Sequence, residues 1–567
     1  MTAPAGLSAK PRSPGRTSET WLDVLHSRAD FQPDRTAFTW LATDTDHDAS
    51  ITYAELDRRA RSIGGLLQST GPPGERALLL LPPGLDFVAA LFGCFYAGWI
   101  AVPAYPPPLN QRLERIRSVA SDAQPRAALT SLAMLGRIEP RLADEPDLGR
   151  LRWLAIDAAT VPPDGWRMPD ASSDDVAVLQ YTSGSTAAPR GVMLSHTNLL
   201  HNAAQIQQRF EASPASRGLI WLPPYHDMGL IGGILEGVWA GFPTALMAPV
   251  AFLQRPRRWL EAITRTQATI SGGPNFAYDL CVDRIPQPER KGLDLSSWRV
   301  AFNGSEPVRP TTLRRFAEAF GPYGFQETAF YPCYGLAEAT LMVSGGRVNT
   351  PPIVHDLEDG RHVVGCGQSI DDQTLLIVDP VSFAPRAPGE VGEVWLAGPS
   401  VAAGYWQQPL LSEDVFGARL ADGSGPYLRT GDLGFIDDTE LFITGRLKAV
   451  LILGGRKIHA EDIEGSLSDR QPGTRPGGVV ALSIEAGGQE RLVVIQEVRL
   501  AADLDATARS IRARIAEAHQ LPVWSVVLTR PGAIPRTSSG KVQRSASHAL
   551  FVTHQFDTVY EWQAPWS

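Results

Sequence analysis

The stretch that most constrains this chain runs from Tyr181 to Asn198 and reads YTSGSTAAPRGVMLSHTN. The apolar and β-branched run Val176–Thr182 predicts a buried strand, and Val192–Leu194 predicts a second, shorter strand. Between them lie small hydroxyl residues and a glycine, followed by Arg190 and Gly191. A loop this dense in backbone N–H groups and hydroxyls, beside a cation, favours a polyphosphate ligand. An ordinary Ser/Gly turn is the alternative, whereas a Walker A loop is excluded because no Gly-Lys-Ser/Thr closes it onto a helix.

Composition narrows the class of protein. The chain has 567 residues, of which 43% are hydrophobic and 20% are charged, so we expect an enzyme-like protein of at least two domains. A net charge of −9 argues against a nucleic-acid-binding surface. The cysteines Cys94, Cys281, Cys333 and Cys366 are far apart and form no CxxC pair. They fit reduced cytoplasmic thiols better than zinc ligands or disulfides, and we expect a cytoplasmic location.

Two segments could be mistaken for targeting or membrane signals. Residues 1–18 are rich in proline and lack an apolar core, so we interpret them as a flexible arm. Phe87–Tyr105 is long enough to cross a membrane, but Gly98 and Pro103 interrupt it. A buried helix that stops at Gly98, followed by a strand at Trp99–Val102, is the better interpretation.

Strand and helix patterns alternate through most of the chain. Thr52 and Glu55 form a capping box that opens an amphipathic helix, and Ser195 is placed to cap another. This alternation predicts an α/β domain with largely parallel sheets. From Gly389 the chain changes to short strands separated by glycine and proline, and a small α/β unit follows near Arg446–Lys448. We therefore expect a large domain at 19–446 and a small C-terminal domain at 447–567; the small domain's predicted strands are Val479–Ile484, Leu492–Val498 and Val523–Leu528.

Polar and aromatic turns follow several predicted strands. They are Trp221–Gly229, which contains His226, then Asn303–Pro307 and Tyr331–Glu338. Loops at the ends of strands are where open α/β sheets bind their ligands. A lone histidine such as His226 is often structural, and that alternative stays open.

In this order the motifs resemble those of the adenylate-forming superfamily, which includes acyl-CoA synthetases, luciferases and peptide-synthetase adenylation domains. The resemblance covers about Thr20 to Arg544. It implies a large N-terminal α/β domain, with two parallel-sheet subdomains and a β-rich one, and a small mobile C-terminal α+β domain. It also implies that a carboxylate attacks the α-phosphate of ATP with Mg²⁺ present, pyrophosphate leaves and an acyl adenylate forms. Catalysis of that step is mostly charge neutralisation and positioning.

The same resemblance gives the site residues their roles. Thr182, Ser183, Gly184, Ser185, Thr186 and Arg190 would hold the departing phosphates, and Glu338 would hold Mg²⁺. The adenine would lie against Asn303, Gly304, Ser305, Glu306, Tyr334, Gly335 and Leu336, with Tyr334 stacked on it. Asp432 would accept both ribose hydroxyls with help from Arg446, Lys541 would contact the α-phosphate and the acyl carboxylate, His226 would lie beside that carboxylate, and Lys448 would be the domain hinge.

Within the superfamily the sequence motifs are most similar to those of fatty acyl-AMP ligases, at Ala101–Pro107, Trp221–Gly229 and Gly404–Trp406. Such ligases activate a fatty acid and pass it to the phosphopantetheine of an acyl carrier protein rather than to coenzyme A. That branch has an inserted segment which is trimmed here to Gly346–His362, so coenzyme A as acceptor stays open.

Three residues depart from the family pattern: Ala187 and Arg190 replace a glycine and a lysine in the phosphate loop, and Ala449 replaces an acidic residue after the hinge. Ala187 has less backbone freedom than glycine. Arg190 keeps the positive charge, but its guanidinium is planar, whereas a lysine ammonium acts as a point charge. We expect altered rates rather than an inactive site. A non-catalytic adenylate-binding protein is the competing hypothesis from another class. The leading hypothesis is a fatty acid adenylating enzyme that serves a separate carrier protein.

Overall fold

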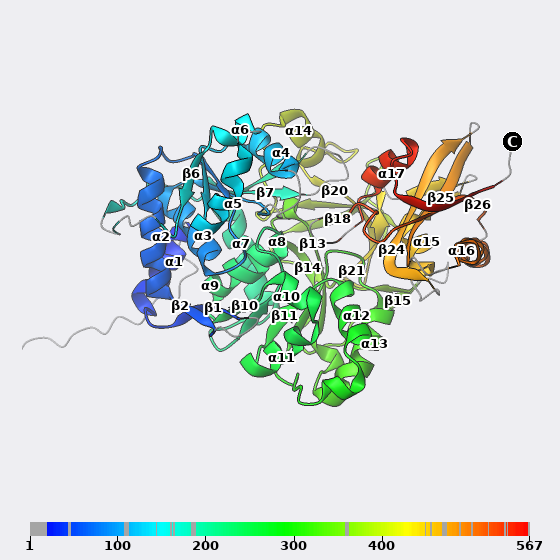
Figure 1. Cartoon of the computed structure of the whole chain (residues 1–567), viewed down its shortest axis with the longest axis horizontal. Helices are drawn as coiled ribbons and strands as arrows, with labels where there is room; N and C mark the ends of the chain where they lie inside the picture. Colours follow the sequence, from blue (N-terminus) through cyan, green and yellow to red (C-terminus); the bar gives the residue numbers. More distant parts are fainter. Residues whose placement is uncertain are drawn as a thin grey trace, which may run out of the picture. The chain divides into compact units, whose positions relative to one another are not determined.

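The computed structural model in Figure 1 describes most of the chain. The described residues are 20–42, 47–106, 113–142, 145–158, 162, 165–182, 189–357, 362–447, 450–453, 456–467, 473–486, 489–499, 503–519, 521–537, 540 and 542–564. The expected arm at 1–18 lies outside them. They group into two compact units, the first within Met1–Thr182, Arg190–Thr430 and Phe435–Ile443, the second from Gly431–Gly434 and Thr444–Ser567 together with Pro189.

The first sheet of the large unit has six strands in the order β6-β5-β3-β4-β7-β8. All neighbouring pairs are parallel except β7 and β8, which form an antiparallel pair at one edge. The strands are β3 (Arg76–Leu79), β4 (Ile100–Pro103), β5 (Ala127–Thr130), β6 (Arg152–Ala155), β7 (Val176–Thr182) and β8 (Arg190–Ser195). The predicted strand Val176–Thr182 is therefore confirmed with its bounds, and it ends where the phosphate loop begins.

The second sheet has nine strands in the order β17-β14-β13-β12-β11-β9-β10-β1-β2. Its central strands, from β13 to β1, are parallel, and antiparallel strands close both edges. Its strands are β1 (Thr36–Trp40), β2 (Ala49–Thr52), β9 (Gly218–Ile220), β10 (Thr244–Leu246), β11 (Ile270–Gly272), β12 (Val300–Asn303), β13 (Phe330–Gly335), β14 (Met342–Gly345) and β17 (Gln368–Ser369). The turns Asn303–Pro307 and Tyr331–Glu338 follow or complete the adjacent strands β12 and β13, so parallel pairing brings them to one edge of the sheet.

The remaining strands form smaller sheets. They are a four-stranded sheet in the order β18-β19-β20-β21 (Thr374–Val378, Gly392–Ala397, Leu428–Asp437, Glu440–Arg446) and the hairpins β15-β16 (Val354–Asp356, His362–Val364) and β22-β23 (Val450–Leu453, Arg456–His459). The trimmed segment Gly346–His362 thus contributes β15 and the first residue of β16, and residues 358–361 lie outside the described part. The expected fold class, an α/β protein with parallel sheets, a β-rich part and a C-terminal α+β unit, is confirmed.

The C-terminal unit contains the sheet β24-β25-β26-β27 (Thr474–Ala486, Gln489–Val498, Val523–Thr529, Thr558–Gln563). Successive residues of β24 point to opposite faces, as strand geometry requires: Ala481 packs in a cluster with α15 and α16, and Leu482 packs in a cluster that includes Phe551 of α17. Strand β27 and helix α17 were not predicted from the sequence. The sequence pattern did predict β25, β26 and the helix between them, which is α16 in the structure.

The helices agree with the local signals that predicted them. Thr52 caps α2 in a complete capping box with Glu55, and Ser195 caps α7. Helix α3 is buried and stops at Gly98, whose φ of 68° is the left-handed conformation that favours glycine. The helices are α1 (Trp21–Phe31), α2 (Tyr53–Gln68), α3 (Leu85–Ala97), α4 (Glu114–Ala123), α5 (Leu132–Leu142), α6 (Pro146–Gly149), α7 (His196–Arg209), α8 (Asp227–Gly229), α9 (Glu236–Ala240), α10 (Pro249–Gln254), α11 (Arg257–Thr266), α12 (Asn275–Arg284), α13 (Pro310–Phe320), α14 (Pro409–Phe416), α15 (Ala460–Ser466), α16 (Leu504–His519) and α17 (Arg544–Val552).

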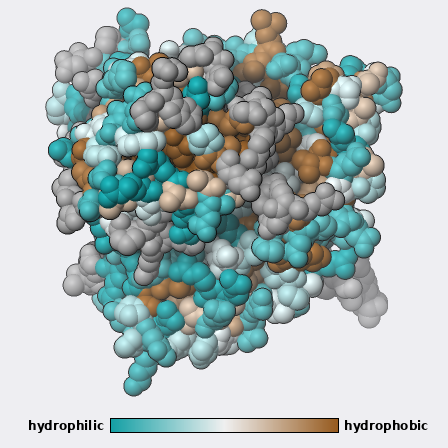
Figure 2. Space-filling model, turned by 90° about the vertical axis from the view of Figure 1, so that its right-hand side faces the viewer, coloured by the Kyte–Doolittle hydropathy of each residue, from teal (hydrophilic) through white to brown (hydrophobic). Residues whose placement is uncertain are grey.

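Among the described helices, none is long and apolar enough to cross a membrane. The space-filling view in Figure 2 shows a largely hydrophilic face, with hydrophobic groups gathered in a band across its middle. Large apolar side chains that reach solvent include Val381 and Leu410, each 87% exposed.

One buried carboxyl in the large unit has no partner to stabilise its charge. Glu236 begins α9 directly after a π-helical turn at Leu230–Leu235 and is 1% exposed. Neither of its carboxyl oxygens has a hydrogen-bond partner among the described residues. Burial raises the pKa of Glu236 well above its usual range, because the charged form loses its hydration. Burial therefore favours the protonated form of the carboxyl in the folded protein.

This protonation predicts a pH-dependent effect of Glu236→Gln on stability. In the unfolded chain Glu236 ionises near its ordinary pKa of 4.5, while in the folded chain burial raises its pKa. The wild type therefore loses stability relative to the variant as the pH rises above about 4.5, by at most about 1.4 kcal/mol per pH unit, until the folded-state pKa is reached. We expect the variant to raise the apparent Tm at pH 7–8 and to change it little at pH 4, as measured by thermal unfolding. The exposed Glu289→Gln is the control, and a Tm difference that does not vary with pH would contradict the protonated state.

Candidate active site

The predicted phosphate loop connects β7 to β8, and the residues at both of its ends are described. Thr182 ends β7 and pairs across the ladder with Arg190, the first residue of β8. Ser183, Gly184, Ser185, Thr186 and the substituted Ala187 lie outside the described residues. The antiparallel stem therefore fixes both ends of the loop on the edge of the six-stranded sheet.

A second segment runs along this edge and brings in Tyr405. The amide of Met193 donates to the carbonyl of Gly404 at 2.9 Å, and the amide of Trp406 donates to the carbonyl of Gly191 at 2.8 Å. These bonds extend the sheet beyond β8 by a few residues. Ser412 of α14 fixes the same segment, because its Oγ accepts from the Tyr405 amide at 2.9 Å.

Tyr405 connects Arg190 to Glu338. Its Oη donates to Glu338 Oε1 at 2.9 Å, and the Arg190 guanidinium carbon lies 5.5 Å from the centre of its ring. Burial and then the nearby Glu338 carboxylate raise the pKa of Tyr405, while Arg190 lowers it. Tyr405 thus stays a protonated donor. The cluster joins the phosphate-loop stem to the carboxylate that the resemblance assigns to Mg²⁺, across separations in the sequence that only the fold brings together.

The end of β12 carries unsatisfied acceptors. Asn303 is fully buried and its Nδ2 donates to Asn275 at 3.3 Å, but its Oδ1 has no partner among the described residues. Glu306 Oε1 is also buried and has no hydrogen-bond partner among the described residues. Buried acceptors are nearly always hydrogen-bonded in proteins. These two are suited to a ligand that donates N–H groups, as the amino group of adenine does.

Backbone geometry at the ends of β12 and β13 is restricted. A Cβ on Gly304 would lie 2.7 Å from the Cys333 carbonyl oxygen, and one on Gly335 would lie 1.7 Å from that of Leu341. Ser305 and Thr340 have positive φ values of 74° and 68°, which are uncommon for residues with a side chain. Such strain concentrates at functional sites. Of the other predicted adenine contacts, Tyr334 is 9% exposed and packs in a core cluster together with Leu336.

His226 precedes the short helix α8. Its Nδ1 lies 2.5 Å from Asp227 Oδ1 and within 3.4 Å of the Met228 amide. The carboxylate fixes the orientation of the ring. The loop itself is held by Gln180 of β7, whose Nε2 donates to the Tyr225 carbonyl at 2.9 Å.

The two residues predicted to bind the ribose, Asp432 and Arg446, form an ion pair in the second unit. Asp432 of β20 is 4% exposed, and its Oδ1 lies 2.8 Å from Nε of Arg446, at the end of β21. The arginine side chain is 61% exposed, so this ion pair contributes little to stability. Lys448 and Lys541 lie outside the described residues.

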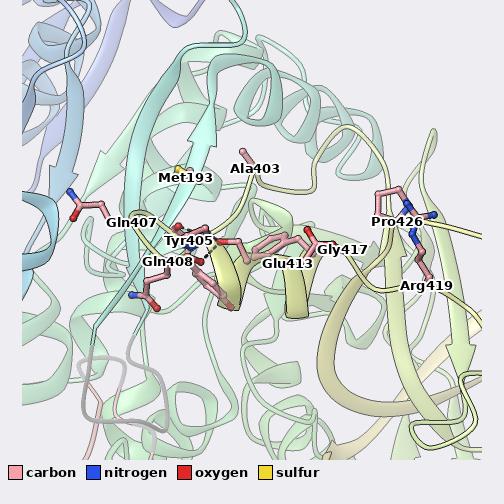
Figure 3. Close-up of a pocket in the computed structure, with 12 residues that line it drawn as sticks. Met193, Ala403, Tyr405, Gln407, Gln408, Glu413, Gly417, Arg419 and Pro426 are labelled. Carbon is pink, nitrogen blue, oxygen red and sulfur yellow. Dashed lines mark hydrogen bonds between the residues drawn. The ribbon is translucent and has the colours of Figure 1, made fainter.

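An open pocket of about 610 Å³ is lined in part by Tyr405 (Figure 3). Its lining comes mostly from the segment around α14: Met193, Ala403, Tyr405, Gln407, Gln408, Pro409, Ser412, Glu413, Phe416, Gly417, Arg419 and Pro426. None of the site residues predicted from the sequence lines it. A smaller apolar pocket includes Gly229 and Ile234, which follow His226 in the chain.

The family to which this geometry belongs is shown by comparison with known proteins. Residues 25–406 match the family model described as "AMP-binding enzyme", and the chain belongs to that family. It is 41% identical to the medium-chain-fatty-acid–[acyl-carrier-protein] ligase JamA of Moorena producens, over 96% of each chain. It is also 36% identical to the long-chain-fatty-acid–AMP ligase FadD23 of Mycobacterium tuberculosis, over 94% of this chain and 96% of that one.

Solved structures agree with this assignment. The fatty acyl-adenylate ligase of Legionella pneumophila, in complex with acyl adenylate and pyrophosphate, superposes with a TM-score of 0.75 at 38% identity. The match covers 96% of this chain and 98% of that one. The sequence motifs assigned no role to Tyr405, although its place in Gly404–Trp406 was a signal for it.

Proposed function

We propose that this protein is a fatty acyl-AMP ligase: it activates a fatty acid with ATP and then transfers the acyl group to the phosphopantetheine thiol of a separate acyl carrier protein. The observation that carries the proposal is the Arg190–Tyr405–Glu338 cluster at the stem of the phosphate loop. The relatives named as fatty acid ligases supply the substrate class. We place the enzyme in the cytoplasm, consistent with four free cysteines.

In the first half-reaction a fatty acid carboxylate oxygen attacks the α-phosphorus of ATP, and the bond to pyrophosphate breaks. Thr182 to Thr186 and Arg190 would hold the leaving pyrophosphate, and Lys541 would contact the α-phosphate and the carboxylate. Two anions meet in this step, so positioned cations and N–H donors lower the barrier most. The acceptor oxygens of Asn303 and Glu306 would receive N–H groups of the adenine, with Gly304, Ser305, Tyr334, Gly335 and Leu336 around it, and His226 would lie beside the acyl carboxylate.

The residues present also fit a magnesium ion. Among the described residues no group of three or more His, Cys, Asp or Glu could hold a metal. Mg²⁺ typically takes one or two protein carboxylates together with substrate phosphates, and Glu338 supplies one carboxylate. When bound, the ion would neutralise charge on the phosphate oxygens. Tyr405 would orient Glu338 through its hydrogen bond.

In the second half-reaction the thiol attacks the acyl carbonyl and AMP leaves. We propose that residues 19–446 and 447–567 act as two domains that rotate about Lys448 between the half-reactions. An acyl-CoA synthetase is the second candidate, since the inserted segment is shortened to Gly346–His362. The carrier protein is preferred because the relative that is 41% identical is named as a carrier-protein ligase.

The proposal is tested by giving purified protein ATP, Mg²⁺ and a fatty acid series, with coenzyme A or holo-carrier protein supplied in parallel. We expect acyl-AMP without an acceptor, and acyl-carrier protein in preference to acyl-CoA with one. Efficient acyl-CoA synthesis at saturating coenzyme A would favour the second candidate. Absence of acyl-AMP with every fatty acid would contradict the function.

Asp432→Asn tests the ribose site. The amide keeps the shape but loses the anion that would accept two ribose hydroxyls, so binding of a non-hydrolysable acyl-adenylate analogue should weaken by about 1.5–3 kcal/mol. Calorimetry measures this directly. Asp438→Asn, an exposed residue in the following turn, is the matched control. Unchanged affinity in Asp432→Asn would place the ribose elsewhere.

A further inference from the structure

A buried glutamate in the C-terminal unit binds the chain just before the segment that contains Lys541. Glu497, in β25, is fully buried. Its Oε1 accepts from the Gly532 amide at 2.9 Å and from the Ile534 amide at 3.1 Å. Its Oε2 lies 2.8 Å from Arg475 Nη1. The partners are 35 and 37 residues away on one side and 22 on the other, so these bonds are tertiary rather than local.

The segment after Ile534 is closed by its own hydrogen bonds. The Gln543 amide donates to the Pro535 carbonyl at 2.9 Å, and Arg536 and Val542 form an antiparallel bridge. Arg536 Nη1 donates to the Gly540 carbonyl at 2.9 Å, and its Nη2 donates to the Gly477 carbonyl. Lys541 is covalently joined to Gly540 and Val542, both of which take part in this closure. Glu497 therefore anchors the entry to a loop whose described residues, on both sides of Lys541 in the sequence, are closed by hydrogen bonds.

The chemistry of the anchor requires a carboxylate. A buried charge is costly unless it is paired and hydrogen-bonded, and Glu497 meets both conditions with three donors. Charge-assisted bonds to backbone N–H groups are stronger than neutral ones. Glutamine would offer one acceptor oxygen, and its NH₂ would face either the backbone amides or the Arg475 guanidinium, which are also donors. The isosteric change thus loosens the loop entry while keeping its volume.

We propose that Glu497 is a positioning residue for Lys541, acting in the adenylate-forming half-reaction and not in acyl transfer. The inference rests on the proposed function, in which Lys541 contacts the α-phosphate only during adenylation. A displacement of about 1 Å far from the reacting atoms can cost about 100-fold in rate. A residue that only stabilised the C-terminal unit would affect both half-reactions equally.

The test is Glu497→Gln assayed in each half-reaction separately. We expect adenylation, measured as pyrophosphate release, to slow about 10- to 100-fold in kcat with the KM for ATP little changed. Transfer from supplied acyl-AMP to holo-carrier protein should stay within about twofold. Glu490→Gln, an exposed glutamate in the same strand, is the matched control and should match the wild type.

Two further variants separate positioning from folding. In a Lys541→Ala background, Glu497→Gln should add little, because the group that it positions is already gone. If Glu497→Gln does not fold, Arg475→Gln removes the ion pair alone and should show a smaller loss confined to adenylation. Unchanged adenylation in a folded Glu497→Gln, or equal losses in both half-reactions, would overturn the proposal. A wild type that forms no acyl-AMP would instead contradict the proposed function.

Discussion

Lys541→Ala is expected to slow acyl-adenylate formation by about 100-fold or more while leaving the protein folded. The magnitude is that of losing one charged contact to the transition state. The segment around Lys541 is rich in glycine and serine and is closed by bonds from Arg536, Gln543 and Pro535, none of which uses the lysine side chain. We therefore expect the truncation to remove a charge and to leave these bonds in place.

Pyrophosphate release measures this effect, and transfer of acyl groups from supplied acyl-AMP should persist. Lys291→Ala, which removes an exposed lysine of the large unit, is the control and should behave as the wild type. Near-normal pyrophosphate release by Lys541→Ala would remove Lys541 from the site. Equal loss in both half-reactions would indicate a damaged C-terminal unit instead.

Glu338→Gln is the second substitution for which we expect a large effect. The amide keeps an acceptor for the Tyr405 hydroxyl at the 2.9 Å contact, so the local structure should survive. It lacks the negative charge that would bind Mg²⁺ beside the phosphates. We expect adenylation to fall about 100-fold at a fixed Mg²⁺ concentration, with partial recovery as the Mg²⁺ concentration is raised.

Companion variants separate the metal role from the hydrogen bond. Tyr405→Phe removes the donor but leaves the carboxylate, and should cost about tenfold or less, because the net contribution of one hydrogen bond is about 0.5–1.5 kcal/mol and the anion remains. Glu327→Gln changes an exposed glutamate just before β13, the strand that precedes Glu338, and is the control. A Glu338→Gln enzyme with wild-type rate and Mg²⁺ dependence would show that the ion is held elsewhere.

We expect the choice of acyl acceptor to depend on the C-terminal unit and on the trimmed segment Gly346–His362. In this chain that segment still forms the β15-β16 hairpin, where His355 lies 5.2 Å from the ring of Phe435 and 5.3 Å from that of Phe442. The hairpin is thus packed on β20 and β21 rather than absent. Competition between coenzyme A and holo-carrier protein in one reaction would measure the preference directly.

Much of the fold was readable from the sequence because its signals are local. A capping box lies within three residues, as at Thr52 and Glu55, and an apolar face repeats within one turn, as at Leu56, Ala60 and Ile63. Strand Val176–Thr182 and the stop at Gly98 were predicted for the same reason. Strand β27 was missed because Thr558–Gln563 alternates polar and apolar residues weakly, and only pairing with β26 makes it a strand.

The candidate site also has features that local sequence signals predict and features that only the fold creates. The sequence by itself determined which residue types stand at the ends of the strands, and hence the family and the chemistry. Only the tertiary structure decided that Tyr405 joins Arg190 to Glu338, and that Glu497 holds Gly532 and Ile534. These contacts join residues tens to hundreds of positions apart, and no periodicity or short motif encodes such a distance. They form because parallel strands bring their ends to one edge of a sheet, and because a buried carboxylate is stable only where the fold supplies donors.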